Sequence, residues 1–417
     1  MRVLHTSDWH LGQTLHQFER SHEHSQFLGW LLDTLVNEQI DSLLIAGDVF
    51  DNSNPSAASQ AQFYGFLTEA RRRVAHLKIV VTAGNHDSPG RLEAPAPFLS
   101  LLDACVVGQT PRDGGDIALD RLVVPLADRD GVVAAWCIAM PFLRPGDVPR
   151  VEAAADPYTA GITALYRQAF EHACRKRTPG QAVIALGHCH LTSAKVSEDS
   201  ERRIIIGGAE ALSADIFDAQ LAYVALGHLH LAQSVGADPT RRYCGSPLPM
   251  SFSEIDYPHQ VVVFDLRGEV AHNIREIRIP RTVELLRVPR QPASLEDALR
   301  ELQTLNPPPR SEAEWPYLQV RVQLSQPEPG LRAQVEAALA GKQVRLVRIE
   351  TSYAKNSALA TAQAASLDEL NSLAPADFFD RLYQNRFGAA PPAEILAAFT
   401  ELVDSPYQTT AQTAAPA

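Results

Sequence analysis

Five short apolar runs in the first 230 residues each end in a cluster of polar residues. Continuous apolar runs of four to eight residues are typical of strands that are buried on both faces. Polar residues directly after such strands are where layered α/β proteins place their functional sites. The runs and the clusters are 2–6 before Ser7-Asp8-Trp9-His10, 42–46 before Gly47-Asp48, 78–83 before Gly84-Asn85-His86-Asp87, 183–186 before Gly187-His188, and 223–226 before Gly227-His228-Leu229-His230.

Helical patterns separate these predicted strands. Apolar residues recur at a spacing of three or four in 22–39 and in 58–73, which is the periodicity of an amphipathic helix. Strands that alternate with helices predict a layered α/β core. Shorter runs and frequent turns between 105 and 142 indicate that part of the sheet is antiparallel, and strands at 260–266 and 270–277 close this part of the chain.

The pattern predicts a first domain over 1–280 and a smaller α+β domain over 281–351. The smaller domain combines an expected strand at 283–288, a helix at 294–302 with Ser294 as N-cap, a strand at 318–324, a helix at 331–339 and a strand at 344–349. With about 70 residues, it is near the lower end for a domain.

The last part of the chain predicts a linker, a helical segment and a tail. The Ala/Ser/Thr-rich stretch 352–365 is typical of a linker, and 406–417 is expected to be disordered. Between them, 366–405 predicts two short amphipathic helices. Their apolar faces carry Phe378, Phe379 and Leu382 on the first helix and Ile395, Phe399 and Leu402 on the second.

Charge and cysteine usage restrict the class of protein. The net charge of -12 argues against a nucleic-acid protein if taken alone, because phosphate contacts need a basic face. Net charge does not describe local patches, however, and carboxylates at a metal site are neutralised by the ions they bind. The five cysteines include no C-x-x-C pair, which favours free thiols in the cytoplasm. No apolar run reaches the roughly 20 residues of a membrane span, and the first residues lack the apolar core of a signal peptide.

The polar clusters offer carboxylates, imidazoles and one amide, without sulfur. This set suits Mn²⁺, Fe²⁺ or Zn²⁺ better than Ca²⁺. It is large enough for two ions, and a pair of ions roughly 3.5–4 Å apart can activate water and clamp a phosphate. Any one cluster could be a simple turn, and Asp87 could cap the turn through Ser88 and Pro89. Five clusters at five strand ends favour a metal site. The candidates are Asp8, His10, Asp48, Asn85, His86, His188, His228 and His230.

Five motifs in this order resemble the calcineurin-like metallophosphoesterase superfamily, and their details resemble its SbcD nuclease branch. The shared motifs are H-T-S-D-W-H-L-G (5–12), G-D-V-F-D (47–51), G-N-H-D (84–87), G-H (187–188) and G-H-L-H (227–230). The features of the branch are G-N-H-D-S-P-x-R-L (84–92), A-L-G-H-L-H-x-A-Q (225–233) and Y-C-G-S-P-L-P-x-S-F (243–252). The resemblance implies a β-sandwich flanked by helices, a small α+β capping domain that contacts DNA, and a C-terminal helical segment that binds a partner.

The resemblance also implies a role for each candidate. One ion is expected on Asp8, His10 and His230, a second on Asn85, His188 and His228, and Asp48 between the two. His86 is expected to face the scissile phosphate, where it protonates the leaving oxygen or stabilises the transition state. His190 is the alternative to His188, and the role of Asp51 stays open, with a solvated or turn-stabilising side chain favoured. His16, His22 and His24 lie in or near a polar stretch and are predicted at the surface.

The implied activity is Mn²⁺-dependent hydrolysis of DNA, with Fe²⁺ or Mg²⁺ as alternatives. The expected substrates are double-strand ends, hairpins and single strands, in DNA repair, recombination and replication. The implied partner is an SbcC-type coiled-coil ATPase that binds the C-terminal helices, in a heterotetramer that contains a homodimer of this chain. Those helices could instead fold back onto the first domain. The competing functions are another phosphoesterase, such as a phosphatase, a cyclic-nucleotide phosphodiesterase or a nucleotidase, and a non-enzymatic DNA-end scaffold. The extra C-terminal domain argues against the first, and the complete ligand set argues against the second.

Overall fold

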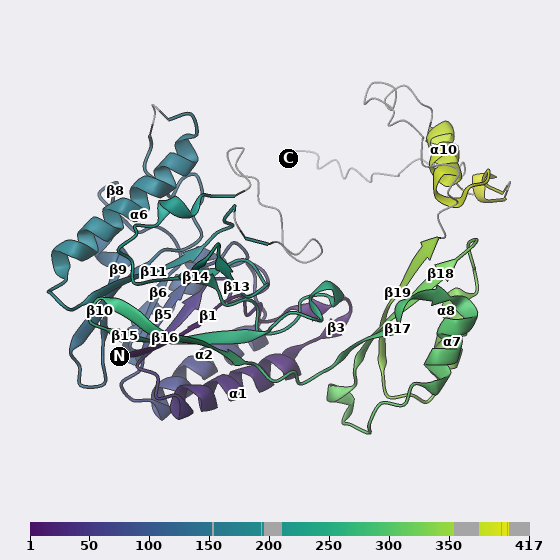
Figure 1. Ribbon diagram of the computed structural model, residues 1–417, viewed down its shortest axis with the longest axis horizontal. Coiled ribbons are helices and arrows are strands. Elements are labelled where there is room, and N and C mark those ends of the chain that lie inside the picture. Colours follow the sequence, from purple (N-terminus) through teal and green to yellow (C-terminus); the bar gives the residue numbers. More distant parts are fainter. Residues whose placement is uncertain are drawn as a thin grey trace, which may run out of the picture. The chain divides into compact units, whose positions relative to one another are not determined.

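The chain forms two compact units, residues 1–284 and residues 285–417, which are described separately. The computed structural model describes residues 1–151, 154–192, 194–195, 211–353, 375–392, 394–397 and 399 (Figure 1). The division between the units lies four residues after the predicted boundary at 280.

The first unit contains two six-stranded sheets. The first has the order β16-β15-β1-β4-β5-β6, and the second has the order β13-β14-β12-β11-β10-β9. The first sheet consists of β1 (Arg2–Thr6), β4 (Ser42–Ala46), β5 (Lys78–Thr82), β6 (Ala104–Val107), β15 (Gln260–Arg267) and β16 (Val270–Arg278). The second consists of β9 (Val123–Ala127), β10 (Val133–Ala139), β11 (Ala182–His188), β12 (Tyr223–Gly227), β13 (Gln233–Val235) and β14 (Asp238–Tyr243).

The centre of each sheet is parallel. Antiparallel strands lie at one edge of the first sheet and at both edges of the second. β1, β4, β5 and β6 are parallel neighbours, whereas β15 runs antiparallel to β1. In the second sheet, β9 pairs antiparallel with β10, as the sequence between 105 and 142 predicts. The carboxyl ends of parallel neighbours lie at one edge of a sheet, so the polar clusters that follow β1, β4 and β5 lie together.

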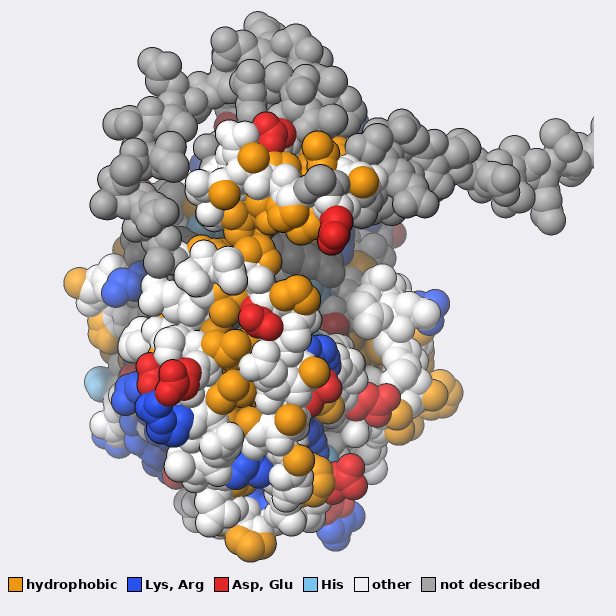
Figure 2. Space-filling view, turned by 90° about the vertical axis from the view of Figure 1, so that its right-hand side faces the viewer, with side chains coloured by type: hydrophobic (Ala, Val, Ile, Leu, Met, Phe, Trp, Pro, Cys, Tyr) orange, Lys and Arg blue, Asp and Glu red, His pale blue; other side chains and the backbone are white. Residues whose placement is uncertain are grey.

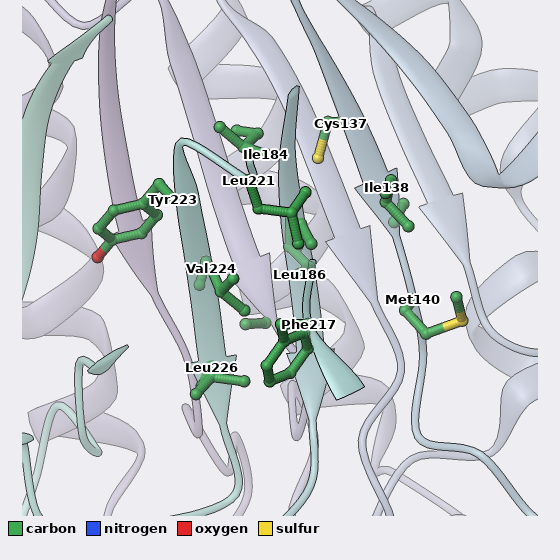
Figure 3. Packing of buried hydrophobic residues seen from close by; sticks show 14 of the residues in the cluster. Cys137, Ile138, Met140, Ile184, Leu186, Phe217, Leu221, Tyr223, Val224 and Leu226 are labelled. Atoms are coloured by element: carbon green, nitrogen blue, oxygen red, sulfur yellow. The ribbon is translucent and has the colours of Figure 1, made fainter. Parts of the chain in front are cut away.

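Alternate residues of the central strands are buried on opposite faces of the first sheet. Val3 and Leu44 belong to a core that also holds strands of the second sheet and α6 (Pro157–Lys176). Leu4 and Leu43 belong to a second core with α1 (Ser21–Asn37) and α2 (Ala57–Arg73). Figure 3 shows side chains of β10, β11 and β12 packed in the first of these cores. The first unit is therefore a β-sandwich flanked by helices.

Trp9 anchors the turn after β1 by packing against α1 and α2. Its side chain is fully buried, and its indole N–H donates to Thr6 Oγ1 at 2.9 Å. The ring packs edge-to-face on Phe27 of α1 and Phe66 of α2, with centroid distances of 5.6 and 5.2 Å. Because Trp9 lies between Asp8 and His10, this packing fixes the backbone from which both candidate ligands project.

Shorter elements complete the first unit, and one short helix lies in the second. They are β2 (Thr14–Leu15), β3 (Phe18–Glu19), α3 (Pro89–Glu93), α4 (Ala96–Leu99), β7 (Arg112–Asp113), β8 (Asp116–Ile117), α5 (Leu119–Leu122), and the 3₁₀ helices Ser100–Leu102, Ala214–Ile216, Phe252–Glu254 and Glu312–Glu314.

Residues 285–353 of the second unit form a parallel three-stranded sheet that packs with the helices α7 and α8. The sheet has the order β17-β18-β19, and Leu302, Val320 and Val335 lie in its core. The Oγ of Ser294 accepts the N–H of Asp297 at 3.2 Å, so this residue is the N-cap that the sequence predicts. The elements are β17 (Leu285–Ser294), α7 (Leu295–Thr304), β18 (Tyr317–Leu324), α8 (Leu331–Ala338) and β19 (Arg345–Tyr353).

The C-terminal segment is described in part. β19 extends two residues into the predicted linker, to Tyr353, and α10 covers Pro375–Phe387. Residues 394–397 are also helical. Residues 354–374 and 400–417, including Leu402, lie outside the described residues, as does the side chain of Phe378. In the part of the chain that the structure describes, no helix combines the length and the hydropathy of a membrane span.

Candidate metal centre

The polar clusters of both sheets meet at one place in the first unit. Asp8 and His10 follow β1, Asp48 follows β4, and Asn85 and His86 follow β5. From the second sheet, His188 is the last residue of β11, while His228 and His230 follow β12. A contact joins the two sheets there, because Nδ1 of His188 lies 2.9 Å from the carbonyl oxygen of Ala46 at the end of β4. The structure thus brings all eight predicted residues into one cluster.

Four of these residues have a left-handed backbone. The φ angles are 53° for Asp8, 46° for His10, 48° for Asp48 and 99° for His228. Non-glycine residues adopt this conformation at a cost, and such residues concentrate at functional sites. Hydrogen bonds hold the turns in place: the N–H of Asp8 donates to Gly47 O and the N–H of His10 to Asp48 O, both at 3.0 Å. The backbone therefore bends sharply at the strand ends and directs these side chains toward one another.

The first donor group contains Asp8, His10 and His230. One oxygen or nitrogen atom from each lies within 4.8 Å of the others, and all three residues are buried. Oδ1 of Asp8 accepts the N–H of His228 at 2.9 Å. Ser7 Oγ donates to Oδ2 of the same carboxylate. These two hydrogen bonds fix the orientation of the Asp8 carboxylate.

The second donor group surrounds the amide oxygen of Asn85. This oxygen lies 3.0 Å from Nε2 of His188 and 3.0 Å from Nδ1 of His228. A spacing of about 3 Å is that of adjacent ligands around an octahedral ion with bonds of about 2.1 Å. The side chain of Asp48 lies between the two groups, because its Oδ2 is 3.4 Å from His188 Nε2 and 3.6 Å from His10 Nε2.

These residues fit divalent cations. The donors are oxygen and nitrogen atoms, which bind Mn²⁺, Fe²⁺ or Zn²⁺. Both ring nitrogens of His10 are buried and make no hydrogen bond with the described residues, although Nδ1 lies 3.4 Å from Oδ1 of Asp51. A buried polar atom without a hydrogen bond is costly, and a bound ion is one way in which proteins satisfy it.

The electrostatics of the cluster also favour a cation. Burial raises the pKa of Asp8. Burial acts in the same direction on Asp48, but the charge and hydrogen bond of His188 outweigh it and lower the pKa of Asp48. Burial lowers the pKa of His188, and the charge of Asp48 outweighs that effect and raises it to about 9. A proton on His188 thus supplies positive charge that a divalent ion would supply in its place.

His86 is half-buried, whereas most residues of the cluster are buried. Its backbone N–H donates to Asp48 Oδ1 at 2.8 Å, and its ring Nδ1 lies 2.7 Å from the carbonyl oxygen of Asp51. A carbonyl oxygen only accepts, so Nδ1 carries hydrogen and Nε2 is the atom that can take up or release a proton. The His86 ring packs edge-to-face on His10 at 4.8 Å.

The structure shows where the residues of the two open alternatives lie. His188, not His190, lies with Asp8 and Asp48 in the cluster. Asp51 is one-third exposed, and it contacts His10 through its carboxylate and His86 through its carbonyl. The interpretation of Asp51 as only a solvated or turn residue is therefore incomplete.

Sequence reasoning missed the role of Asp87. Its buried carboxylate accepts the backbone N–H groups of Val49 at 3.1 Å, Phe50 at 2.9 Å and Gly84 at 2.9 Å. Burial and the charge of Asp48 raise the pKa of Asp87 to about 6. The residue thus joins the turns after β4 and β5, instead of capping the turn through Ser88. Its place in the G-N-H-D motif was the available signal.

Sequence reasoning also missed the backbone and side-chain atoms that pack closely against Gly84 and Gly227, and the contact that Glu254 makes with His230. A Cβ atom on Gly84 would lie 2.1 Å from Asp48 Oδ1, and one on Gly227 would lie 1.9 Å from Ala46 O. Glu254 contacts Nδ1 of His230 at 2.8 Å. This glutamate follows His230 by 24 residues, and no spacing in the sequence pointed to it.

Two family models match the chain. Residues 1–232 match the calcineurin-like phosphoesterase family, and residues 281–387 match a family described as type 5 capsule protein repressor C-terminal domain. The first match spans more than half of the chain. Together with the sandwich fold and the cluster, it defines a metallophosphoesterase, a metal-dependent hydrolase.

Similar proteins of known name show to which family of metallophosphoesterases the chain belongs. The chain is 42% identical over 351 residues to the SbcD component of nuclease SbcCD from Rhodobacter capsulatus, covering 83% of this chain and 86% of the relative. It is 35% identical over 292 residues to the protein of the same name from Escherichia coli, covering 68% and 69%. The protein of that name from Bacillus subtilis is 37% identical over 282 residues, covering 65% and 68%. The chain belongs to the SbcD family of metallophosphoesterase nucleases, which confirms the resemblance seen in its motifs.

Among solved structures, a dimetal phosphatase from Danio rerio covers 67% of this chain and 99% of its own chain. The sequence identity is 11% and the TM-score is 0.34, so this similarity is too distant to bear on the site.

Proposed function

We propose that the chain hydrolyses phosphodiester bonds of DNA with two divalent ions, preferably Mn²⁺, with Fe²⁺ or Mg²⁺ as alternatives. The observation that supports this most is the presence of two donor groups on either side of Asp48. In this proposal, Asp48 would contribute a ligand to both ions, since its Oδ2 lies near His10 of one group and His188 of the other. Asp8, His10 and His230 would hold one ion, and Asn85, His188 and His228 would hold the other.

The ions and the side chains would have separate roles in the reaction. When bound, the ions supply Lewis acidity toward the phosphate and lower the pKa of the attacking water. His86 holds its ring orientation through the carbonyl of Asp51, and its Nε2 gives a proton to the leaving alkoxide oxygen. The backbone N–H of His86 donates to Asp48 at 2.8 Å, which couples the position of this proton donor to the carboxylate between the two donor groups.

The proposed substrates are double-strand ends, hairpins and single strands, and the proposed partner is a coiled-coil ATPase. The relatives are each named as one component of the nuclease SbcCD, which supports a partner. In the C-terminal segment, Phe379 stacks on Phe399 with centroids 4.1 Å apart, while the side chains of Leu382 and Ile395 are 51% and 39% exposed. Figure 2 shows hydrophobic side chains exposed in the upper part of the face that carries this segment in Figure 1. An apolar helical surface of this kind is suited to docking on a partner.

The domain arrangement and the assembly are part of the same proposal. The unit after Glu284 serves as the DNA-contacting cap, and the helices after Pro375 bind the ATPase in a heterotetramer with two copies of this chain. A cytoplasmic location fits the five cysteines, all of which are free thiols in the structure.

The test is cleavage of linear and hairpin DNA by the chain with Mn²⁺, with and without the ATPase, in parallel with Asp48→Ala. We expect cleavage by the unaltered chain, and loss of both cleavage and bound metal in the variant. Retention of two ions by Asp48→Ala would refute the bridging role. Hydrolysis of small phosphoesters without any cleavage of DNA would instead assign the site to another phosphoesterase reaction.

A further inference from the structure

Glu254 is a buried carboxylate behind the first donor group. It ends the 3₁₀ helix Phe252–Glu254 and has no exposed surface. Its Oε1 lies 2.8 Å from Nδ1 of His230, and its Oε2 accepts the backbone N–H of Met250 at 2.8 Å. The two oxygens therefore have different tasks: one faces the candidate ligand, and the other fixes the carboxylate to its own loop.

The contact with Glu254 determines which ring nitrogen of His230 carries hydrogen. An ionised carboxylate only accepts hydrogen bonds, so Nδ1 of His230 must donate. In the neutral ring, Nε2 then keeps its lone pair and is the atom that can bind a cation. Ala46 does the same for His188 with its carbonyl oxygen, at 2.9 Å from Nδ1. A carboxylate, unlike a carbonyl, also makes the ring nitrogen more basic.

The loop that carries Glu254 is anchored to the segment after His10. The guanidinium of Arg20 is buried and donates to the carbonyl of Pro249 at 2.6 Å, while its other nitrogens form a bidentate pair with Glu23 at 2.9 and 2.7 Å. Arg20 also donates to Gln13 Oε1 at 3.0 Å. A buried guanidinium is tolerated only when its charge and donors are matched, so this arrangement holds the loop in one position.

The other side of the loop is held by His259. Its Nδ1 lies 2.9 Å from Ser246 O, and its Nε2 lies 3.3 Å from the carbonyl of Glu254. Burial lowers the pKa of His259, so the neutral ring donates to one of these carbonyls and packs against the other. The Glu254 carboxylate thus projects from a backbone that is fixed on both sides. It keeps His230 in place before any ion is present, and this preorganisation is what supporting residues of metal sites supply.

We propose that Glu254 is a positioning residue that sets the tautomer and orientation of His230 and thereby the affinity for one of the two divalent ions. The inference rests on the proposed two-ion function. Loss of such a supporting contact typically reduces metal affinity by about 10- to 100-fold. Because His230 belongs to the group with Asp8 and His10, the effect is confined to that ion.

The substitution Glu254→Gln tests this proposal with almost no change in shape. The N–H of Met250 and the Nδ1–H of His230 both need an acceptor, and glutamine offers one oxygen and one NH₂ group. If the oxygen faces Met250, the NH₂ group faces His230. Nδ1 must then accept, which places hydrogen on Nε2 and removes its capacity to bind a cation. In the other rotamer, the NH₂ group faces the backbone N–H of Met250, so two donors meet without an acceptor.

The measurement is a calorimetric titration of the metal-free full chain with Mn²⁺. We expect two sites in the unaltered chain, and in Glu254→Gln one unchanged site and one weakened by about 10- to 100-fold. Glu93→Gln is the matched control, since Glu93 Oε1 also accepts a backbone N–H, from Gly108 at 2.7 Å, but is not part of the cluster. Fewer than two sites in the unaltered chain would overturn the proposed function itself. Two unchanged sites in Glu254→Gln would overturn only the role of Glu254.

A second measurement reads the tautomer of His230 in the unaltered chain and does not depend on how Glu254→Gln folds. Nitrogen chemical shifts of ¹⁵N-histidine in the unaltered metal-free chain distinguish the two tautomers of a neutral imidazole. The signal of His230 is assigned by its loss in His230→Asn. We expect hydrogen on Nδ1, as the contact with Glu254 requires. Hydrogen on Nε2 in the neutral ring would overturn the proposal. Equal weakening of both ions in Glu254→Gln would also overturn it, because the role would then be general and structural.

Discussion

Replacing Gly84 by alanine is the most local way to disturb the cluster without removing a ligand. A Cβ atom at this position would lie 2.1 Å from Oδ1 and 2.4 Å from the backbone nitrogen of Asp48. The side chain of Asp48 could rotate, but its backbone cannot give way independently of the turn. That turn is also fixed by Asp87, which accepts the N–H of Gly84 and those of the two residues after Asp48. We therefore expect the two turns to move apart.

The size of the effect follows from the size of the clash. Ordinary contacts of a Cβ atom begin at 3.4 Å, so Asp48 and Gly84 must separate by about 1 Å. A misplacement of about 1 Å at a catalytic centre can lower the rate by about 10²-fold. Forcing a methyl group into a packed region costs about 1–3 kcal/mol of stability. We expect Gly84→Ala to remain folded, with a turnover about 100-fold lower and weaker binding of the ion pair.

The assay compares Gly84→Ala with Gly65→Ala. Gly65 lies in α2 with no heavy atom within 4 Å of an added Cβ, so alanine there should raise stability by about 0.5–1 kcal/mol and leave turnover unchanged. Single-turnover cleavage of DNA with Mn²⁺ gives the rates, and thermal unfolding of the metal-free chains gives the stabilities. If Gly84→Ala cleaves within three-fold of the unaltered chain, the inferred rigidity of the two turns is wrong.

Three further predictions concern the proton donor His86, the C-terminal segment, and Asp87, which connects the turns after β4 and β5. His86→Gln should keep both ions but cleave about 10²- to 10⁴-fold more slowly, because an amide cannot deliver a proton. Metal content and single-turnover rate in one preparation check this, and loss of metal would make His86 a ligand. A chain that ends at Tyr353, the last residue of β19, should retain metal and nuclease activity but fail to co-purify with the ATPase. Undiminished co-purification would place the docking surface elsewhere. Asp87→Asn should lower the free energy of unfolding by about 1–3 kcal/mol, because one amide oxygen cannot accept three backbone N–H groups. Denaturant titration measures the loss, and an unchanged midpoint would refute it.

The strands and the candidate ligands could be predicted because their signals are local. The strands at 2–6 and 42–46 have the bounds that the sequence predicts, since a strand buried on both faces is a continuous apolar run. The candidate ligands come directly after such runs, so the topology of parallel strands brings them to one edge. The strand at 183–186 was predicted too short, because β11 continues through Gly187 to His188. Neither residue is apolar enough to extend the run.

His24 is predicted at the surface from its polar neighbours, although its position on the helix predicts burial. The polar stretch around it predicts a surface residue, but His24 is fully buried and burial lowers its pKa to about 3. It lies three and seven residues before Phe27 and Leu31 on α1, so it shares their buried face. Helical phase, not local polarity, determined its place.

The remaining features depend on contacts between distant parts of the chain. Whether His188 or His190 enters the cluster depends on how the second sheet packs against β4, where Ala46 O meets His188 Nδ1 across 142 residues. The Glu254–His230 contact depends on a loop that Arg20 anchors across 229 residues. Residue spacing along the chain contains no information on such pairs, because they are created by the packing of two sheets and by buried hydrogen bonds that need specific partners. The sequence predicts which groups could hold the ions, and the packing of the sheets determines how those groups are oriented.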